Sequence, residues 1–80
     1  MPYRWKPLGP HIQQYVDEDT GEPVGSVLEC GPYPGLGTYY VLQGEGLTNP
    51  EGGYPTKSTA KTALAMQVAR LASSNDRPHD

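Results

Sequence analysis

The sequence predicts an α+β domain in which an antiparallel sheet of three or four strands carries one C-terminal helix on one face. Three observations support this fold class. Residues 11–30 alternate as two strands about an acidic turn, and residues 38–43 (TYYVLQ) concentrate the β-branched and aromatic side chains that favour strands. Residues 56–73 contain no Gly or Pro and show the spacing of a helix.

The hairpin over residues 11–30 has a register that can be predicted from its turn. Asp19-Thr20-Gly21 favours a turn over residues 18–21, with Gly21 at positive φ as a bulge. The facing pairs are then Val16 with Val24, Gln14 with Ser26, and Ile12 with Leu28. Because side chains alternate along a strand, these residues share one face, which we expect to be buried under the helix. The other face, which we expect to be more exposed, carries His11, Gln13, Tyr15, Gly25, Val27 and Glu29.

Two further segments are predicted strands. Residues 3–6 form a short edge strand that ends at Pro7, since proline cannot donate to a central ladder. Residues 38–43 form a strand whose core-facing side is ambiguous, because Tyr40 and Leu42 compete with Tyr39 and Val41. Loops are predicted at 31–37 and 44–55, both rich in Gly and Pro. The role of the second loop stays open.

The predicted helix begins at a cap formed by Thr56 or Ser58. At about 100° per residue, one stripe along it contains Ala60, Ala63, Leu64, Val68 and Leu71, and Gln67 interrupts the stripe. We expect residues 1–74 to form a single domain and residues 75–80 a disordered tail.

The composition indicates a small core. The chain has 80 residues, 35% of them hydrophobic, with no Phe and a net charge of −3. A domain of this size gains little from its own core, so a protein partner or a homodimer is expected. The sequence shows no signal peptide and no membrane-spanning run, and its one cysteine, Cys30, cannot form an internal disulfide. We therefore expect the cytoplasm of a bacterium or of a phage-infected cell.

No group of residues predicts catalysis, a cofactor or a metal. Asp19-Thr20-Gly21 matches the aspartic-protease triplet, but neighbouring carboxylates make a solvated turn the better interpretation. The acidic cluster of this turn (Asp17, Glu18, Asp19 and Glu22) lacks the spacing of a calcium loop, and an acidic patch for a basic partner is the alternative. His11, Cys30 and His79 have no metal-site spacing. The sequence therefore predicts a protein that is not an enzyme.

A protein-interaction module is the function that the sequence favours. An aromatic sheet face left open would mark a protein contact, and the candidate interaction surface is Trp5, Gln13, Tyr15, Tyr39 and Val41. The alternative is a nucleic-acid-binding accessory protein, which requires the cations of the helix and the N-terminus on one surface. These are Arg4, Lys6, Lys57, Lys61 and Arg70.

The layout also resembles a group of known proteins. A hairpin with Thr20-Gly21 and Val24-Gly25, a strand at 38–43 and an Ala-rich helix opening with residues 58–63 (STAKTA) resemble small uncharacterised proteins of bacteriophages, prophages and mobile elements. The resemblance implies this fold class and a phage or prophage origin, and it implies no catalytic residue.

Overall fold

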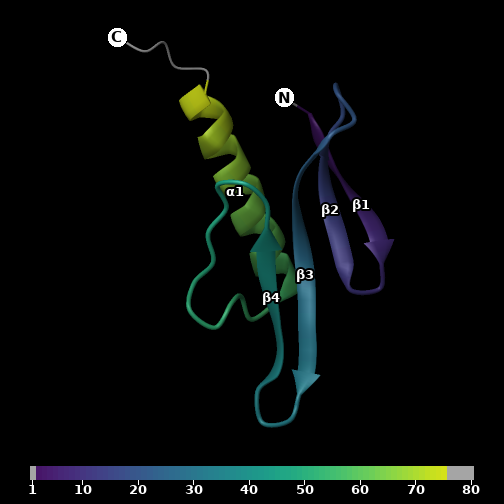
Figure 1. The fold of residues 1–80 in the computed structure, drawn as a ribbon, viewed down its shortest axis with the longest axis vertical. Coiled ribbons are helices and arrows are strands. Elements are labelled where there is room, and N and C mark those ends of the chain that lie inside the picture. Colours follow the sequence, from purple (N-terminus) through teal and green to yellow (C-terminus); the bar gives the residue numbers. More distant parts are fainter. Residues whose placement is uncertain (1, 76–80) are drawn as a thin grey trace.

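A four-stranded antiparallel sheet followed by one helix makes up the computed structural model, which describes residues 2–75 (Figure 1). The strands lie side by side in the order of the chain, and the helix forms a second layer. The predicted α+β class is confirmed. The elements are β1 (Tyr3–Gly9), β2 (Ile12–Asp17), β3 (Pro23–Tyr33), β4 (Gly37–Gln43) and α1 (Lys57–Asn75).

The β2–β3 hairpin closes as predicted but contains one bulge. Gly21 has a φ of 76°, and its N–H donates to the carbonyl of Asp17 at 2.8 Å. Ile12 faces Leu28 as expected, whereas Val16 faces Pro23 instead of Val24. Val24 is therefore the extra residue of the bulge, and it packs against the core under α1.

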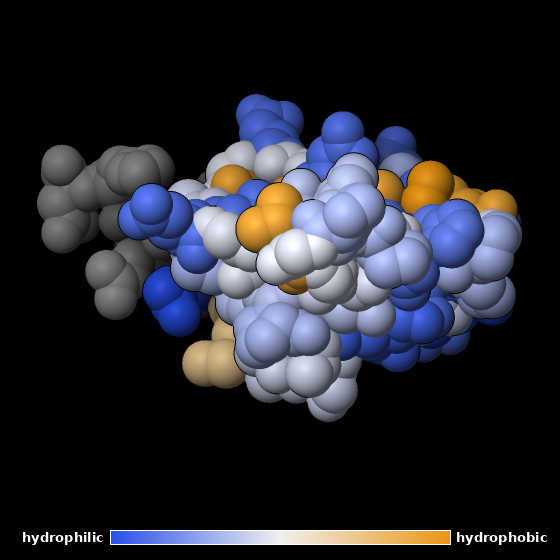
Figure 2. Space-filling view, turned by 90° about the horizontal axis from the view of Figure 1, so that it is seen from below, coloured by the Kyte–Doolittle hydropathy of each residue, from blue (hydrophilic) through white to orange (hydrophobic). Residues whose placement is uncertain are grey.

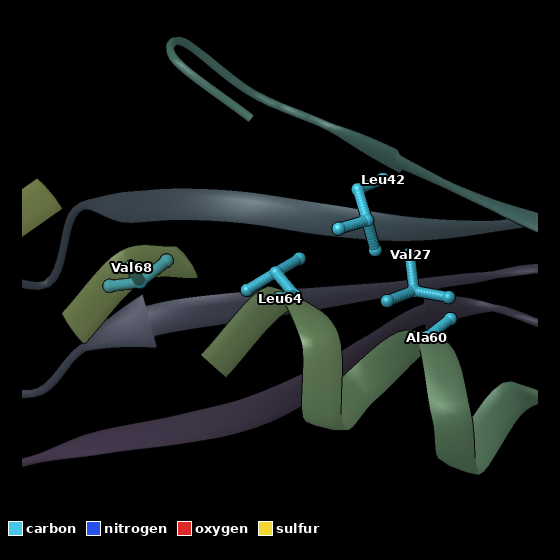
Figure 3. Close-up of a cluster of buried hydrophobic side chains, with 5 residues drawn as sticks. All are labelled: Val27, Leu42, Ala60, Leu64 and Val68. Carbon is cyan, nitrogen blue, oxygen red and sulfur yellow. The ribbon is translucent and has the colours of Figure 1, made fainter. Parts of the chain in front are cut away.

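The prediction of which sheet face the helix covers is wrong. The helix packs on β3 and β4 against the opposite face, where the buried cluster consists of Val27, Leu42, Ala60, Leu64 and Val68 (Figure 3). On the face that we expected to be covered, Ile12 is 37% exposed and Leu28 is half-buried. Val16 is only 5% exposed, but it does not belong to this cluster.

Gly25 explains why the sequence predicted the wrong face for the helix. A Cβ added to Gly25 would be 3.2 Å from Cδ1 of Leu64 and 2.8 Å from Cδ1 of Leu47, so both leucines use the space that a side chain would fill. We chose the buried face by its number of aliphatic side chains, and a glycine does not add to that number. Here the missing side chain of Gly25 allows the helix to approach closely. The helix can approach because Ala60, a small residue, also lies in the contact and is 0% exposed.

In strand β4, Tyr40 and Leu42 face the core under the helix. Leu42 is 4% exposed and belongs to the cluster under α1, and Tyr40 packs against the same cluster. Tyr39 and Val41 therefore point to the face away from the helix. The segment predicted as a loop at 31–37 is shorter than expected, because β3 continues to Tyr33 and β4 begins at Gly37.

Strand β1 is an edge strand, as predicted, but it does not end at Pro7. It continues to Gly9 past a register shift between Pro7 and Gly9. The N–H of Glu18 donates to the carbonyl of Pro2 at 3.1 Å, and alternation along the strand directs the backbone groups of Arg4 and Lys6 to β2 as well. The N–H that Pro7 lacks would thus point away from the sheet, so proline is tolerated there.

The helix begins at Lys57 with Thr56 as its cap. Oγ1 of Thr56 accepts a hydrogen bond from the N–H of Thr59 at 3.1 Å. The predicted stripe is buried at Ala60, Leu64 and Val68, whereas Leu71 is 37% exposed. Of the tail predicted at 75–80, Asn75 is the last helical residue, and residues 76–80 lie outside the described part of the chain.

Two side-chain amides fix the connection between β4 and α1. Asn49 accepts from the N–H of Leu42 at 2.7 Å and donates to its carbonyl at 3.0 Å. Gln67 does the same for Thr48, at 2.8 Å and 3.0 Å. Gln67, which interrupts the predicted apolar stripe, is thereby explained as the residue through which α1 holds the connection.

The connection also closes the outer edge of β4. Tyr54 exchanges two backbone hydrogen bonds with Tyr40, at 2.9 Å and 2.7 Å. With Asn49 bonded to Leu42, the outward-pointing backbone groups of β4 are satisfied at Tyr40 and at Leu42. The Tyr40–Leu42 part of this edge is therefore not available to another strand.

Candidate functional site

The five residues of the predicted interaction surface lie on two different faces of the sheet. Trp5 faces Tyr15 across β1 and β2, and both pack against the core under α1. Gln13 faces the buried Val27 across β2 and β3, so it lies on the same side. Tyr39 and Val41 lie on the opposite side. The structure therefore does not bring these five residues together.

The aromatic residues on the helix side extend the core beyond the reach of α1. The ring of Tyr15 lies 5.0 Å from that of Tyr3 and 4.5 Å from that of Trp5, measured between centroids. Nζ of Lys61, on α1, lies 4.7 Å from the centroid of Trp5. Burial, and to a lesser degree Tyr3, raises the pKa of Tyr15 above its ordinary 10.0. These rings fill the space between α1 and β1, which is a packing role.

The opposite side of the sheet, here called the helix-free face, carries a continuous apolar row. Ile12 faces Leu28, and Leu28 faces Val41, so three aliphatic side chains stand in register across three strands. They are half-buried or, for Ile12, 37% exposed. In Figure 2, hydrophobic residues gather along the upper right margin of an otherwise largely hydrophilic surface.

Aromatic and thiol groups continue the apolar row towards the β3–β4 turn. Cys30 faces Tyr39 across the two strands, and the ring of Tyr33 lies 6.0 Å from that of Tyr39. The negative charge that Cys30 carries when it ionises is the largest cause that raises the pKa of Tyr39 above 10.0. Tyr33 is 48% exposed and Leu36, in the turn itself, is 78% exposed. Sequence reasoning found only Tyr39 and Val41 of this patch, because it placed the helix over Ile12 and Leu28.

A polar row borders the apolar row on its other side. Lys6 faces Gln14, Gln14 faces Ser26, and Ser26 faces Gln43, across all four strands. At the same end, a hollow of about 550 Å³ lies on the helix side of the sheet, where Val68, Leu71 and Ala72 of α1 line it together with Val24, Gly25 and Glu45. The helix-free face thus has an apolar centre and a polar, charged margin, which is the usual anatomy of a protein contact.

His11 and Glu29, which the sequence places on the same face of the hairpin, form a side-chain pair. Nδ1 of His11 lies 3.0 Å from Oε2 of Glu29, and the hydroxyl of Tyr40 donates to Oε1 of Glu29 at 3.4 Å. Burial, followed by the charge of Glu29, raises the pKa of Tyr40 above 10.0. The carboxylate ties β4 to the start of β2, and no Ser or Cys side chain joins this group among its hydrogen-bond partners within residues 2–75.

The Asp19-Thr20-Gly21 triplet forms a solvated turn, as we expected. All three residues are exposed. Oδ1 of Asp17 accepts from the N–H of Asp19 at 2.8 Å, and Oγ1 of Thr20 accepts from the N–H of Glu22 at 3.2 Å. The side chains stabilise the turn, which is their role in many short hairpins.

The cations that the nucleic-acid alternative requires do not lie on one surface. By the register of β1, Arg4 and Lys6 point to the helix-free face. Lys61 lies over Trp5 on the other side of the sheet. Arg70 lines a separate hollow with Met66 and Tyr54. Arg4 and Lys6 thus lie on the other side of the sheet from Lys61, which shares a hollow with Lys57.

No family model matches this chain, and no curated protein or solved structure is significantly similar to it. Within residues 2–75, no helix has the length and apolar character needed to cross a membrane. In the same part of the chain, no three His, Cys, Asp or Glu side chains gather as a metal site would require.

Proposed function

We propose that this protein is a non-enzymatic protein-interaction module that uses the helix-free face of its sheet as its contact surface. The observation that carries this proposal is the apolar row of Ile12, Leu28 and Val41, on which no helix or strand within residues 2–75 packs. The connection after β4 approaches the row only at its end, where a Cβ on Gly53 would lie 3.4 Å from Cγ1 of Val41. Sheets with one open face normally present polar side chains there, so a row of aliphatic residues marks a contact.

The small core supports the same proposal. Among residues 2–72, the buried hydrophobic side chains are three valines, two leucines and one alanine, and one of the valines, Val16, lies outside the sheet–helix cluster. A domain with so little buried apolar surface gains stability when a partner covers more of it. A homodimer formed through the sheet is the form of the proposal that needs no other molecule.

A reducing compartment is part of the proposal. Cys30 is a free, half-buried thiol within the contact surface, and free thiols persist in the cytoplasm. We therefore propose the cytoplasm of a bacterium or of a phage-infected cell. The order of a sheet followed by an Ala-rich helix supports a phage or prophage origin.

Light scattering on a sizing column, at several protein concentrations, tests the contact surface. We expect a mass near twice 8.7 kDa that falls towards 8.7 kDa on dilution. Ile12→Asp and Leu28→Asp should both give monomers. Ile12→Asp should also retain the circular dichroism of the parent, because Ile12 is 37% exposed, whereas Leu28 is half-buried. Met66→Asp is the matched control, since Met66 is 57% exposed on α1.

Two outcomes would contradict the homodimer form of the proposal. A parent protein that stays monomeric at millimolar concentration would show that the helix-free face does not bind a second copy. A dimer that persists in both Ile12→Asp and Leu28→Asp would show that the contact lies elsewhere.

A further inference from the structure

We infer that the outer edge of β1 binds an extended acidic segment of a partner protein, which adds to the sheet as a further antiparallel strand. This site goes beyond the proposed function, because it consists of a strand edge and not of the helix-free face. Its ligand is a peptide chain that carries carboxylate side chains at every second position. The inference rests on the free backbone groups of β1 and on the charges of its side chains.

The two edges of the sheet differ in the backbone groups that they leave free. At the β4 edge, Tyr54 and Asn49 bond the outward-pointing groups of Tyr40 and Leu42. β1 forms the other edge, and no strand within residues 2–75 pairs with its outer side (Figure 1). A strand edge of this kind can accept an extended peptide through main-chain hydrogen bonds.

The free backbone groups of this edge belong to Tyr3, Trp5 and Pro7. The N–H of Glu18 donates to the carbonyl of Pro2, so the even-numbered residues at the start of β1 direct their backbone groups to β2. Tyr3 and Trp5 therefore direct both N–H and C=O outward, whereas Pro7 can offer only its carbonyl. The free donors thus end at Trp5, which limits the site to a short peptide segment.

Arg4 and Lys6 determine which peptide fits this edge. Both side chains are exposed, and they face the uncharged Val16 and Gln14 of β2. Neither cation takes part in a salt bridge within residues 2–75. In an added strand, the side chains opposite these two residues lie beside them on the same face of the sheet. Carboxylates at those positions form two cross-strand ion pairs.

The intervening residues of β1 favour apolar side chains in the peptide. Tyr3 and Trp5 lie on the helix side and are half-buried against Tyr15. The helix packs on β3 and β4, and only Nζ of Lys61 reaches the ring of Trp5, at 4.7 Å from its centroid. Apolar residues opposite Tyr3 and Trp5 would cover these rings further. The fitting sequence therefore alternates acidic and apolar residues.

The same charges disfavour a second copy of this chain at this edge. Antiparallel pairing of two β1 strands about Trp5 places Arg4 opposite Lys6 of the second copy. Pairing about Arg4 or Lys6 places each of these cations opposite its own counterpart. Like charges directly opposite each other destabilise a strand pair. The side chains that protect the edge from self-association are thus the ones that attract an acidic strand.

Three short peptides of different charge test the inference. They alternate Val with Glu, with Gln or with Lys, have blocked ends and carry a fluorescent label, and their binding is followed by fluorescence anisotropy. The Glu–Val peptide should bind at least about tenfold more tightly than the Lys–Val peptide, because two attractive pairs replace two repulsive ones. The Gln–Val peptide should have an intermediate affinity.

A charge reversal on β1 should exchange these preferences. Lys6→Glu should raise the dissociation constant of the Glu–Val peptide about fivefold and should strengthen binding of the Lys–Val peptide. Because Lys6 is exposed, the variant should keep the circular dichroism of the parent. Arg70→Glu is the matched control, since it makes the same change of charge at an exposed position on α1. It should leave both dissociation constants within about twofold.

Methylation of the peptide backbone tests strand addition itself. With Glu opposite Arg4 and Lys6, the Val residues lie opposite Tyr3 and Trp5 and direct their N–H groups to β1. N-methylation of the Val residues should therefore weaken binding by at least about tenfold, because it removes these donors. N-methylation of the Glu residues is the control, since their N–H groups point away from β1, and it should change the affinity by no more than about threefold.

Three outcomes would overturn the inference. Equal affinities for the Glu–Val and Lys–Val peptides would remove the role of the cations. Equal losses from the two kinds of methylation would show that the peptide does not add as a strand. Protection of the Trp5 amide from hydrogen exchange that grows with protein concentration, without peptide, would place a second copy at this edge. The mass from light scattering reports on the helix-free face, so each proposal can fail while the other stands.

Discussion

Replacing Leu64 by alanine tests the position of the helix, on which the identification of the open face depends. Leu64 is fully buried, at 0% exposed, and it belongs to the cluster with Val27 and Leu42. The substitution removes three carbon atoms, which at about 0.8 kcal/mol each gives about 2.4 kcal/mol of lost transfer free energy. The cavity left behind adds to this cost, so we expect about 3 kcal/mol in total.

This loss would be large for a domain of this size. Small domains have a free energy of unfolding of roughly 5 kcal/mol, at the lower end of the usual range. For a chain of 60–100 residues, each 1 kcal/mol shifts the melting temperature by about 4–8 °C, so Leu64→Ala should lower it by about 12–24 °C. Thermal unfolding followed by far-ultraviolet circular dichroism measures this shift.

Met66→Ala is the matched control on the same helix. Its side chain is 57% exposed, so the melting temperature should change by no more than about 4 °C. The reasoning would be refuted if Leu64→Ala and Met66→Ala melted within a few degrees of each other. That result would mean that the helix does not pack on the Val27–Leu42 side of the sheet.

Three further predictions concern stability. Gly25→Val should destabilise the domain by about 1–3 kcal/mol in urea unfolding, because the new Cβ lies 2.8 Å from Cδ1 of Leu47, whereas Gly9→Ala, with nothing within 4 Å, should be tolerated. Asn49→Ala should cost about 1–2 kcal/mol in the same assay, since it removes the partner of both backbone groups of Leu42, and the stability of Asn49→Asp should fall similarly because a carboxylate cannot donate. The raised pKa of Tyr15 means that the folded state holds this proton more tightly than the unfolded chain, so stability should be constant below about pH 9 and fall as the pH rises through the raised value, with a smaller fall in Tyr15→Phe. Urea midpoints measured from pH 8 to about pH 11 would contradict the sign if they rose with pH.

Local signals in the sequence predicted the elements but not the side of the sheet to which the helix binds. The turn at Gly21, the pairing of Ile12 with Leu28 and the cap at Thr56 depend on neighbouring residues, and all three are confirmed. The side of the sheet depends on the fit between Leu64 and the space above Gly25, which are far apart in the chain. Hydropathy carries no information about such a fit.

The five residues of the predicted interaction surface lie on two different faces for the same reason. Tyr39 and Val41 were predicted to be accessible and do lie on the helix-free face, but Trp5 and Tyr15 support the core from beside α1. The bulge at Val24 added to the error, because it moved one of the four aliphatic residues of the predicted core face to the other side. A single extra residue in one strand has no signature in residue type that would have revealed it.

The side-chain amides of Asn49 and Gln67 also determine which parts of the molecule unfold together. The N–H of Leu42 lies at the sheet edge and is bonded only by the side chain of Asn49, whereas the N–H of Val41 points towards β3. Amide hydrogen exchange at Leu42 should therefore report the release of the 44–55 connection, and exchange at Val41 the separation of the sheet. Because Gln67 joins the same connection to α1, undocking of the helix also releases Thr48. We therefore expect the 44–55 connection to unfold together with the helix, although it contains no helix or strand of its own.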